Sequence, residues 1–176
     1  EGAAMRCYRN AKGKIGSAMR NTEFYFQPGI TWSKISSSRF AARWMDPGFV
    51  FDDTGRSGFV IDDSDDRESI LAAMVSNFAN EALKLLAPTL TFTSGELENV
   101  PIAKPSGNEI ILNSKKAINY ARYDWDSYER SWGFQRNSIL GDSTKSTVLL
   151  ESSYKNWIRQ NCNSLGELKK LEEENN

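Results

Sequence analysis

The chain of 176 residues contains no histidine and only two cysteines, Cys7 and Cys162. The absence of histidine excludes histidine-based acid–base catalysis, histidine-dependent triads and metal sites with imidazole ligands. Two cysteines so far apart in sequence cannot form a zinc site alone. They indicate reduced thiols in a cytoplasmic protein better than a disulfide framework.

Other absences narrow the function classes further. No apolar run approaches the roughly 18 residues that a membrane-spanning helix needs, and no signal peptide is recognisable. No GxxxxGK[ST] loop occurs and no GxGxxG follows a strand, so a phosphate-cradling loop is unsupported. We therefore expect no catalytic, cofactor-binding or metal-binding residue here, and no membrane contact. The chain starts without Met and stops inside a helical pattern, which indicates a fragment.

The charges of the chain are distributed unevenly, although the net charge is only −1. Residues 1–45 hold eight basic and two acidic side chains, whereas residues 46–66 hold seven aspartates and one arginine. Such an asymmetry can place a basic surface on a nearly neutral protein. The alternative is that both segments are ordinary solvated loops.

Hydrophobic patterning predicts an α+β unit organised around a helix at Arg67–Leu86. Apolar residues recur there at three- and four-residue steps; the stripe comprises Ile70, Leu71, Met74, Phe78, Ala82 and Leu85. Asp65 is the expected N-cap and Pro88 ends the helix. We expect extended segments at residues 30–36, 40–45, 49–52, 59–61, 89–92 and 100–102, and a glycine-bounded turn at residues 54–58 that exposes Arg56.

The second part of the chain is predicted to be mainly helical. Pro105-Ser106-Gly107 is the expected boundary between an α+β domain at 1–104 and a helical extension at 105–176. Helices are expected at residues 109–122, 124–131 and 146–176, the last with a leucine-containing seam that could pack on a neighbouring helix.

Two acidic groups invite a chemical interpretation. The aspartates at 62–66 could bind a hard cation through their oxygens, but capping and solvation explain them better ahead of a helix. Asp124 and Asp126 could act as paired carboxylates, although their place suggests helix caps. Neither group is specific enough to predict an enzyme.

Basic and aromatic residues alternate between Ile30 and Trp44. Lysine and arginine can neutralise phosphates, and aromatic rings can stack on an unpaired base. The alternative, which we favour for the tryptophans, is that Trp32, Phe40 and Trp44 belong to the core while the cations face water.

Five segments resemble, in order, those of the large adenine-specific DNA methyltransferases of the BREX phage-defence type (PglX) and of related fused restriction–modification enzymes. They are YFQPGITWSKI (25–35), GFVFD (48–52) with Gly55 and Ser57, LAPTLTF (86–92) through Gly95 and Val100-Pro101-Ile102, DWDSYERSWGF (124–134) and LKKLEEENN (168–176). In that family these motifs lie downstream of the methyltransferase core, in the region that resembles a target-recognition domain.

The resemblance implies a curved, mainly antiparallel sheet packed on one central helix and followed by a helical extension. It also implies that the intact enzyme uses S-adenosylmethionine to methylate adenine N6. The family's Asn-Pro-Pro-Tyr motif and glycine-containing cofactor loop have no counterpart here. We therefore expect the fragment to have no methyltransferase activity and to help choose where its parent enzyme methylates double-stranded DNA.

This hypothesis assigns DNA contacts to particular residues. Phosphate contacts are expected from Lys12, Lys14, Arg20, Lys34, Arg39 and Arg43, and base contacts from the loop residues Arg56 and Ser57. The upstream methyltransferase domain of the same parent chain is the expected intramolecular partner. The alternative function is a protein-interaction module, in which the Trp125–Phe134 segment and the leucine-containing last helix dock other subunits of a defence complex.

Overall fold

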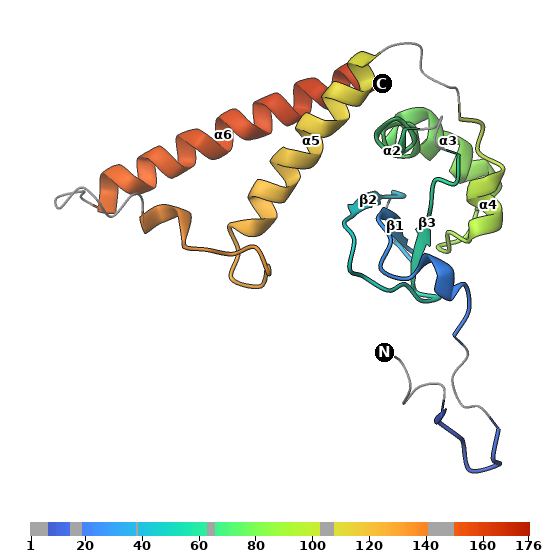
Figure 1. Cartoon of the computed structure of the whole chain (residues 1–176). Helices are drawn as coiled ribbons and strands as arrows, with labels where there is room; N and C mark the ends of the chain where they lie inside the picture. Colours follow the sequence, from blue (N-terminus) through green and yellow to red (C-terminus); the bar gives the residue numbers. More distant parts are fainter. Residues whose placement is uncertain (1–6, 15–18, 38, 63–65, 103–107, 141–149) are drawn as a thin grey trace.

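The computed structural model describes residues 7–14, 19–37, 39–62, 66–102, 108–140 and 150–176 (Figure 1). The elements follow the order η1 (Thr22–Phe24), β1 (Gly29–Ser33), β2 (Ala42–Met45), β3 (Gly55–Gly58), α2 (Arg67–Val75), α3 (Asn77–Leu86), α4 (Ser94–Glu98), α5 (Asn108–Asp126), η2 (Ser138–Leu140) and α6 (Leu150–Asn175). A small sheet with helices packed on it and a helical extension confirm the predicted α+β class.

The sheet is antiparallel, with β1 between β2 and β3. Gly29 lets β1 approach β3 closely, because a Cβ there would lie 2.7 Å from the carbonyl oxygen of Gly58. The predicted turn at residues 54–58 is wrong, since Gly55–Gly58 form β3. The chain turns earlier, where the Asp52 carboxylate accepts hydrogen bonds from the backbone N–H groups of Thr54 and Gly55 at 2.8 and 2.6 Å.

The aromatic runs on either side of β3 are not strands, which corrects the prediction for residues 49–52 and 59–61. Their rings pack together with the η1 segment instead. Phe59 stacks on Phe24 with a centroid distance of 4.9 Å and lies 5.3 Å from Phe51. Side-chain packing, rather than strand pairing, therefore explains why these residues are aromatic.

The predicted central helix is two helices, α2 and α3, because the helical conformation is interrupted at Ser76. Ser76 has an extended backbone (φ −62°, ψ 159°), and its hydroxyl accepts a hydrogen bond from the Ala79 N–H at 3.2 Å as the N-cap of α3. The predicted N-cap Asp65 lies outside the described residues. Asp66 precedes α2 and makes no side-chain cap bond.

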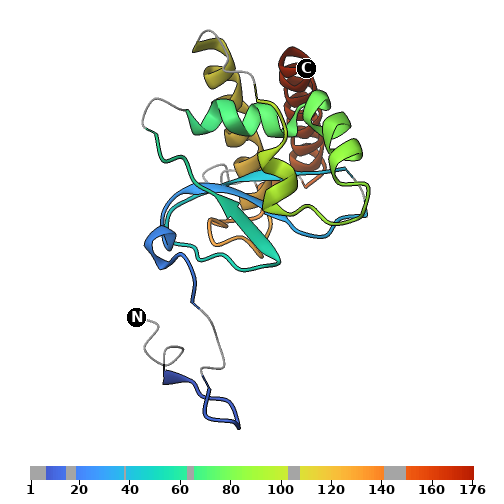
Figure 2. The same ribbon diagram turned by 90° about the vertical axis from the view of Figure 1, so that its right-hand side faces the viewer.

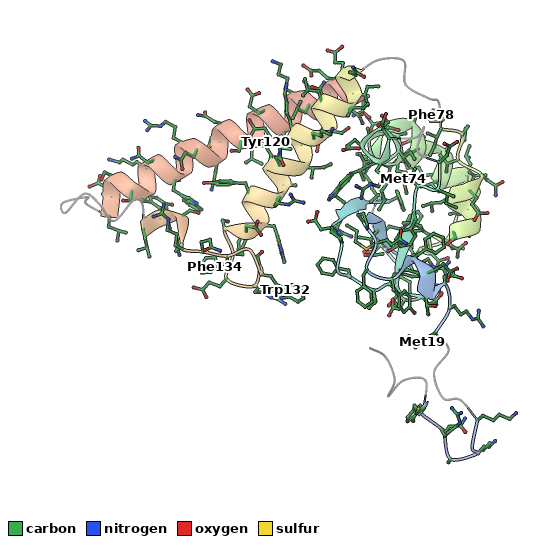
Figure 3. All side chains as sticks on the ribbon, in the orientation of Figure 1. Met19, Met74, Phe78, Tyr120, Trp132 and Phe134 are labelled. Carbon is green, nitrogen blue, oxygen red and sulfur yellow. The ribbon has the colours of Figure 1, made fainter. Side chains whose placement is uncertain are left out.

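The break also changes which residues of α3 face the core. Ala79 and Leu83 are each 2% exposed, whereas the predicted stripe residues Phe78 and Leu85 are 63% and 85% exposed. Phe78 lies on the side of the helix pair away from the sheet (Figure 3). The predicted apolar stripe from Ile70 to Leu85 is therefore wrong for its second half. The interruption at Ser76 rotates α3 about its axis relative to a continuation of α2, so a different set of its residues faces the core.

The main core lies between the sheet and α3. It comprises Trp32, Phe40, Leu83, Ala87 and Phe92. The Trp32 indole N–H donates to the carbonyl of Phe92 at 3.2 Å, so its one polar group is paired. Residues 89–92 run beside the end of β1, with an antiparallel bridge between Ile35 and Thr91. The core interpretation of Trp32 and Phe40 is confirmed, whereas Trp44 is half-buried beneath the Arg67 guanidinium, 4.2 Å from its ring centroid.

The helical extension consists of α5 and α6, which run antiparallel (Figures 1 and 2). A single helix spans Asn108–Asp126, which corrects the two helices predicted there. The hairpin joins the sheet-and-helix unit where α5 meets α2, with Lys115 Nζ 3.6 Å from Glu68 Oε1. Within the described ranges, no helix has the length and apolar content that crossing a membrane requires. The proposed domain boundary lies outside the described residues, so the division at residue 104 stays a prediction.

Candidate nucleic-acid interface

Lys12 and Lys14 lie on a tight turn that the Asn10 side chain organises. The Asn10 carboxamide oxygen accepts from the backbone N–H groups of Lys12 and Lys14 at 3.0 and 3.1 Å. Residues 7–14 are exposed and include Arg9 but no acidic residue. In both ribbon views this turn lies apart from the sheet and helices (Figures 1 and 2). Arg20, also exposed, follows shortly afterwards, before η1.

Lys34 and Arg56 share one carboxylate, that of Asp53. Lys34 forms an ion pair with Asp53 Oδ2, and Arg56 Nη2 lies 2.5 Å from Oδ1. Arg56 also donates to the Asp53 carbonyl at 3.2 Å and to Ser94 Oγ at 3.2 Å. The hydrogen bond from Lys34 holds the pKa of the Asp53 carboxyl below its usual value, and the charge of Arg56 contributes. The predicted exposed loop arginine is therefore wrong: Arg56 belongs to β3, and its side chain is 20% exposed.

Two more carboxylates near these cations hold the backbone. The Gly55 and Thr54 hydrogen bonds lower the pKa of Asp52. Glu96 forms a capping box with Thr93 at the start of α4, and the hydrogen bonds from Thr93 lower its pKa. Asp52 therefore stabilises the turn before β3, and Glu96 stabilises the start of α4.

Arg39 lies near the start of α3, beside a hollow of about 410 Å³. Its Nη2 donates to Asn77 Oδ1 at 2.5 Å. Because this partner is a neutral amide, the hydrogen bond orients the guanidinium without neutralising its charge. The hollow is lined mainly by apolar atoms of Phe40, Leu83 and Phe92, and Lys84 lies with Arg39 among its lining residues.

Arg43 is exposed on β2 and shares a row with Thr31 and Ser57 across the sheet. Cross-strand partners place their side chains on the same face of a sheet. This face is opposite to the one that carries Trp32, because Thr31 and Trp32 are consecutive in β1. Ser57 is half-buried and belongs to β3 rather than to the predicted loop, with its Oγ 3.5 Å from Met45 Sδ.

The eight predicted contact residues do not form one continuous surface. Lys12 and Lys14 lie on the separate turn, Arg43 and Ser57 share one sheet face, and Arg56 points to the other face. Lys34 joins Arg56 through Asp53, and Arg39 lies beside α3. The sequence did not reveal this separation. Consecutive residues of a strand place their side chains on opposite faces of the sheet, so residues that are close in sequence can face different sides.

Of the two acidic groups noted in the sequence, the structure describes Asp124 and Asp126 completely. Asp124 and Asp126 lie in the last turn of α5, so the interpretation as caps at a helix start is wrong. Asp126 Oδ1 accepts from Ser131 Oγ at 2.5 Å, which ties down the loop after α5. Residues 63–65 of the other acidic run lie outside the described residues. In the part of the chain that the structure covers, no group of three acidic or cysteine residues could hold a metal ion.

A second exposed surface surrounds the loop after α5. Trp132, in this loop (Figure 3), is 92% exposed and stacks on Phe49, with a centroid distance of 5.8 Å and an interplanar angle of 19°. Tyr123, Trp125 and Tyr128 nearby in sequence are each more than half exposed. Trp132 and Phe49 are in contact with each other, and we call this pair the aromatic surface. The sequence indicated it through the Trp125–Phe134 segment, but the contribution of Phe49 depends on the fold.

Comparison with known proteins gives two relatives. No family model matches the chain. The chain is 35% identical over 166 residues, 93% of its length, to the adenine-specific methyltransferase PglX of Lacticaseibacillus casei (strain Zhang). It is 37% identical over 124 residues, 69% of its length, to the adenine-specific methyltransferase BrxX of Escherichia coli O9:H4 (strain HS). The chain spans 14% of the first protein and 10% of the second, so it is similar to a small part of each. The resemblance to the BREX-type methyltransferases is confirmed.

Proposed function

We propose that this chain is a DNA-recognition segment of an adenine-specific methyltransferase. The parent enzyme would transfer a methyl group from S-adenosylmethionine to adenine N6 in double-stranded DNA, in the bacterial cytoplasm. The segment itself would help select the site, because an enzyme that modifies particular sites needs surfaces that bind duplex DNA outside its catalytic centre. The similarity to PglX and BrxX supports this assignment.

The observation that carries the proposal is the basic turn at residues 7–14. It presents Lys12 and Lys14 apart from the folded unit, in a segment that itself contains no acidic residue. A segment of this kind can follow a phosphate backbone, where each cation displaces bound counterions. Arg20 would extend the contact toward η1.

Arg39 and Arg43 would supply phosphate contacts from the folded unit. Arg43 is exposed, and the hydrogen bond of Arg39 to Asn77 holds its guanidinium in place without cancelling its charge. Lys34 and Arg56 are left out of this proposed set, because Asp53 already pairs with both. Moving either one to a phosphate would leave Asp53 with its negative charge close to the DNA, which is unfavourable.

The salt dependence of duplex binding tests the proposal. We expect K12A/K14A to reduce the slope of log affinity against log salt concentration by about two, equally for every DNA sequence, because two phosphate contacts are lost. The matched control K169A/K170A removes the same charge from α6 and should leave the slope unchanged. An unaltered slope in both K12A/K14A and R39A/R43A would reject DNA binding by these residues.

The aromatic surface supports a second candidate function, docking to protein. Exposed aromatic clusters of this kind mark protein–protein contacts. The partner would be the rest of the parent methyltransferase or another subunit of a defence complex. Trp132→Ala should then weaken that association without changing the salt dependence of DNA binding, as measured by co-purification and duplex titration of the same preparations.

A further inference from the structure

The break between α2 and α3 leaves two backbone groups without their helical partners. In an uninterrupted helix, the Ser76 N–H would donate to the Ala72 carbonyl, and the Asn77 N–H to the Ala73 carbonyl. Here the Ser76 N–H turns to the Ala73 carbonyl at 3.3 Å, and the Ser76 hydroxyl donates to the same carbonyl at 2.7 Å. The Ala72 carbonyl and the Asn77 N–H therefore need other partners.

Two asparagines at the end of α6 supply both of them. Asn175 Nδ2 donates to the Ala72 carbonyl at 3.0 Å, and Asn176 Oδ1 accepts from the Asn77 N–H at 2.7 Å. Asn176 Nδ2 donates in turn to the Glu172 carbonyl at 2.6 Å, which fixes the orientation of its amide. One bond requires a side-chain donor and the other an acceptor, and a carboxylate could provide only the acceptor.

The end of α6 is anchored beside this break. Leu171 is 8% exposed, and Glu174 Oε2 accepts from Asn113 Nδ2 of α5 at 3.0 Å. Asn175 and Asn176 thus join the α5–α6 hairpin to the α2–α3 break, and the ion pair between Lys115 and Glu68 joins α5 to α2 separately. Loss of the two asparagine bonds alone would leave the hairpin attached.

The residue that follows the break is also the hydrogen-bond partner of Arg39. Asn77, whose N–H is bound by Asn176, uses its own Oδ1 to accept from Arg39. Two residues further along, α3 enters the core through Ala79 and then Leu83, which contacts the cluster containing Phe40. A shift at the start of α3 would therefore move the partner of Arg39 directly.

We propose that Asn175 and Asn176 are positioning residues: they hold the α2–α3 break, and through Asn77 they hold Arg39 in the geometry for phosphate contact. The role of Arg39 in DNA binding rests on the proposed function above. The restraint on the break and on the guanidinium does not, so the two can be tested separately.

Amide hydrogen exchange in the full chain tests the restraint. We expect N175A/N176A to lower the protection of the Asn77 amide about tenfold, because its hydrogen-bond acceptor is lost. Asn163→Ala removes an exposed asparagine from the same helix and should leave this amide unchanged. The NMR signal of the Arg39 side-chain N–H groups should move in N175A/N176A toward its position in Asn77→Ala.

Conservative variants distinguish positioning from a general loss of structure. Asn176→Asp keeps the acceptor for the Asn77 N–H and should retain its protection, whereas Asn175→Asp loses its donor and should behave like Asn175→Ala. Unchanged Asn77 protection in N175A/N176A would overturn the inference. Lost protection with an unmoved Arg39 signal would overturn the positioning of Arg39. If the exchange results are as expected but Arg39→Ala binds duplex DNA as tightly as the unaltered chain, the DNA contact fails while the restraint stands.

Discussion

Replacing two leucines of α3 tests the arrangement of the core. Leu83 is 2% exposed and belongs to the cluster of Trp32, Phe40, Ala87 and Phe92, whereas Leu85 is 85% exposed. Leu83→Ala should create a cavity and lower the free energy of unfolding by about 3 kcal/mol. For a chain of this length, that loss corresponds to a fall in Tm of roughly 6–12 °C.

Leu85→Ala is the matched control, because it makes the same chemical change two residues away. It removes no buried contact, so the free energy of unfolding should change by less than about 0.5 kcal/mol. Urea unfolding followed by circular dichroism and by tryptophan fluorescence measures both variants. If Leu85→Ala cost as much as Leu83→Ala, the continuous apolar stripe from Ile70 to Leu85 would be correct and the rotation of α3 described above would be wrong.

Two further predictions concern buried hydrogen bonds and acid stability. Trp32→Phe should lower the free energy of unfolding by about 2 kcal/mol in urea titrations, because the Phe92 carbonyl loses its buried donor, whereas Trp125→Phe at an exposed site should have little effect. The pKa of Asp52 is lowered in the folded chain from its usual 3.8, chiefly by the Gly55 N–H, so its contribution to stability is present above that value and is lost as the pH falls below it. Asp52→Asn, whose side-chain oxygen can still accept these bonds, should therefore flatten the fall in the urea midpoint between about pH 5 and pH 2; an equally steep fall would contradict this account.

The candidate interface was only partly predictable from sequence. The sequence indicated which segments are basic, and Lys12 and Lys14 lie on an exposed turn in one of them. It did not indicate that Asp53 would pair with both Lys34 and Arg56. The pairing of Lys34 with Asp53 depends on β1 and β3 being neighbours in the sheet, because this brings together two residues that are 19 positions apart in sequence.

The break in the central helix shows a similar limit. In the sequence pattern Ser76 falls on the polar side of one long helix, and the apolar periodicity continues past it. Serine can nevertheless use its side chain to cap a new helix, and this local bond competes with helix continuation. The outcome becomes favourable here because Asn175 and Asn176, about a hundred residues away, bind the two backbone groups that the break releases.

The sequence by itself determined the α+β class, the burial of Trp32 and Phe40, the lack of histidine chemistry and the similarity to adenine-specific methyltransferases, because each follows from composition, local periodicity or motif order. Tertiary structure alone decided which cations are paired, which face of α3 is buried, and how α6 reaches the α2–α3 break. Those features depend on partners that are distant in sequence, and a hydrogen bond or ion pair forms only where packing brings its two groups within reach.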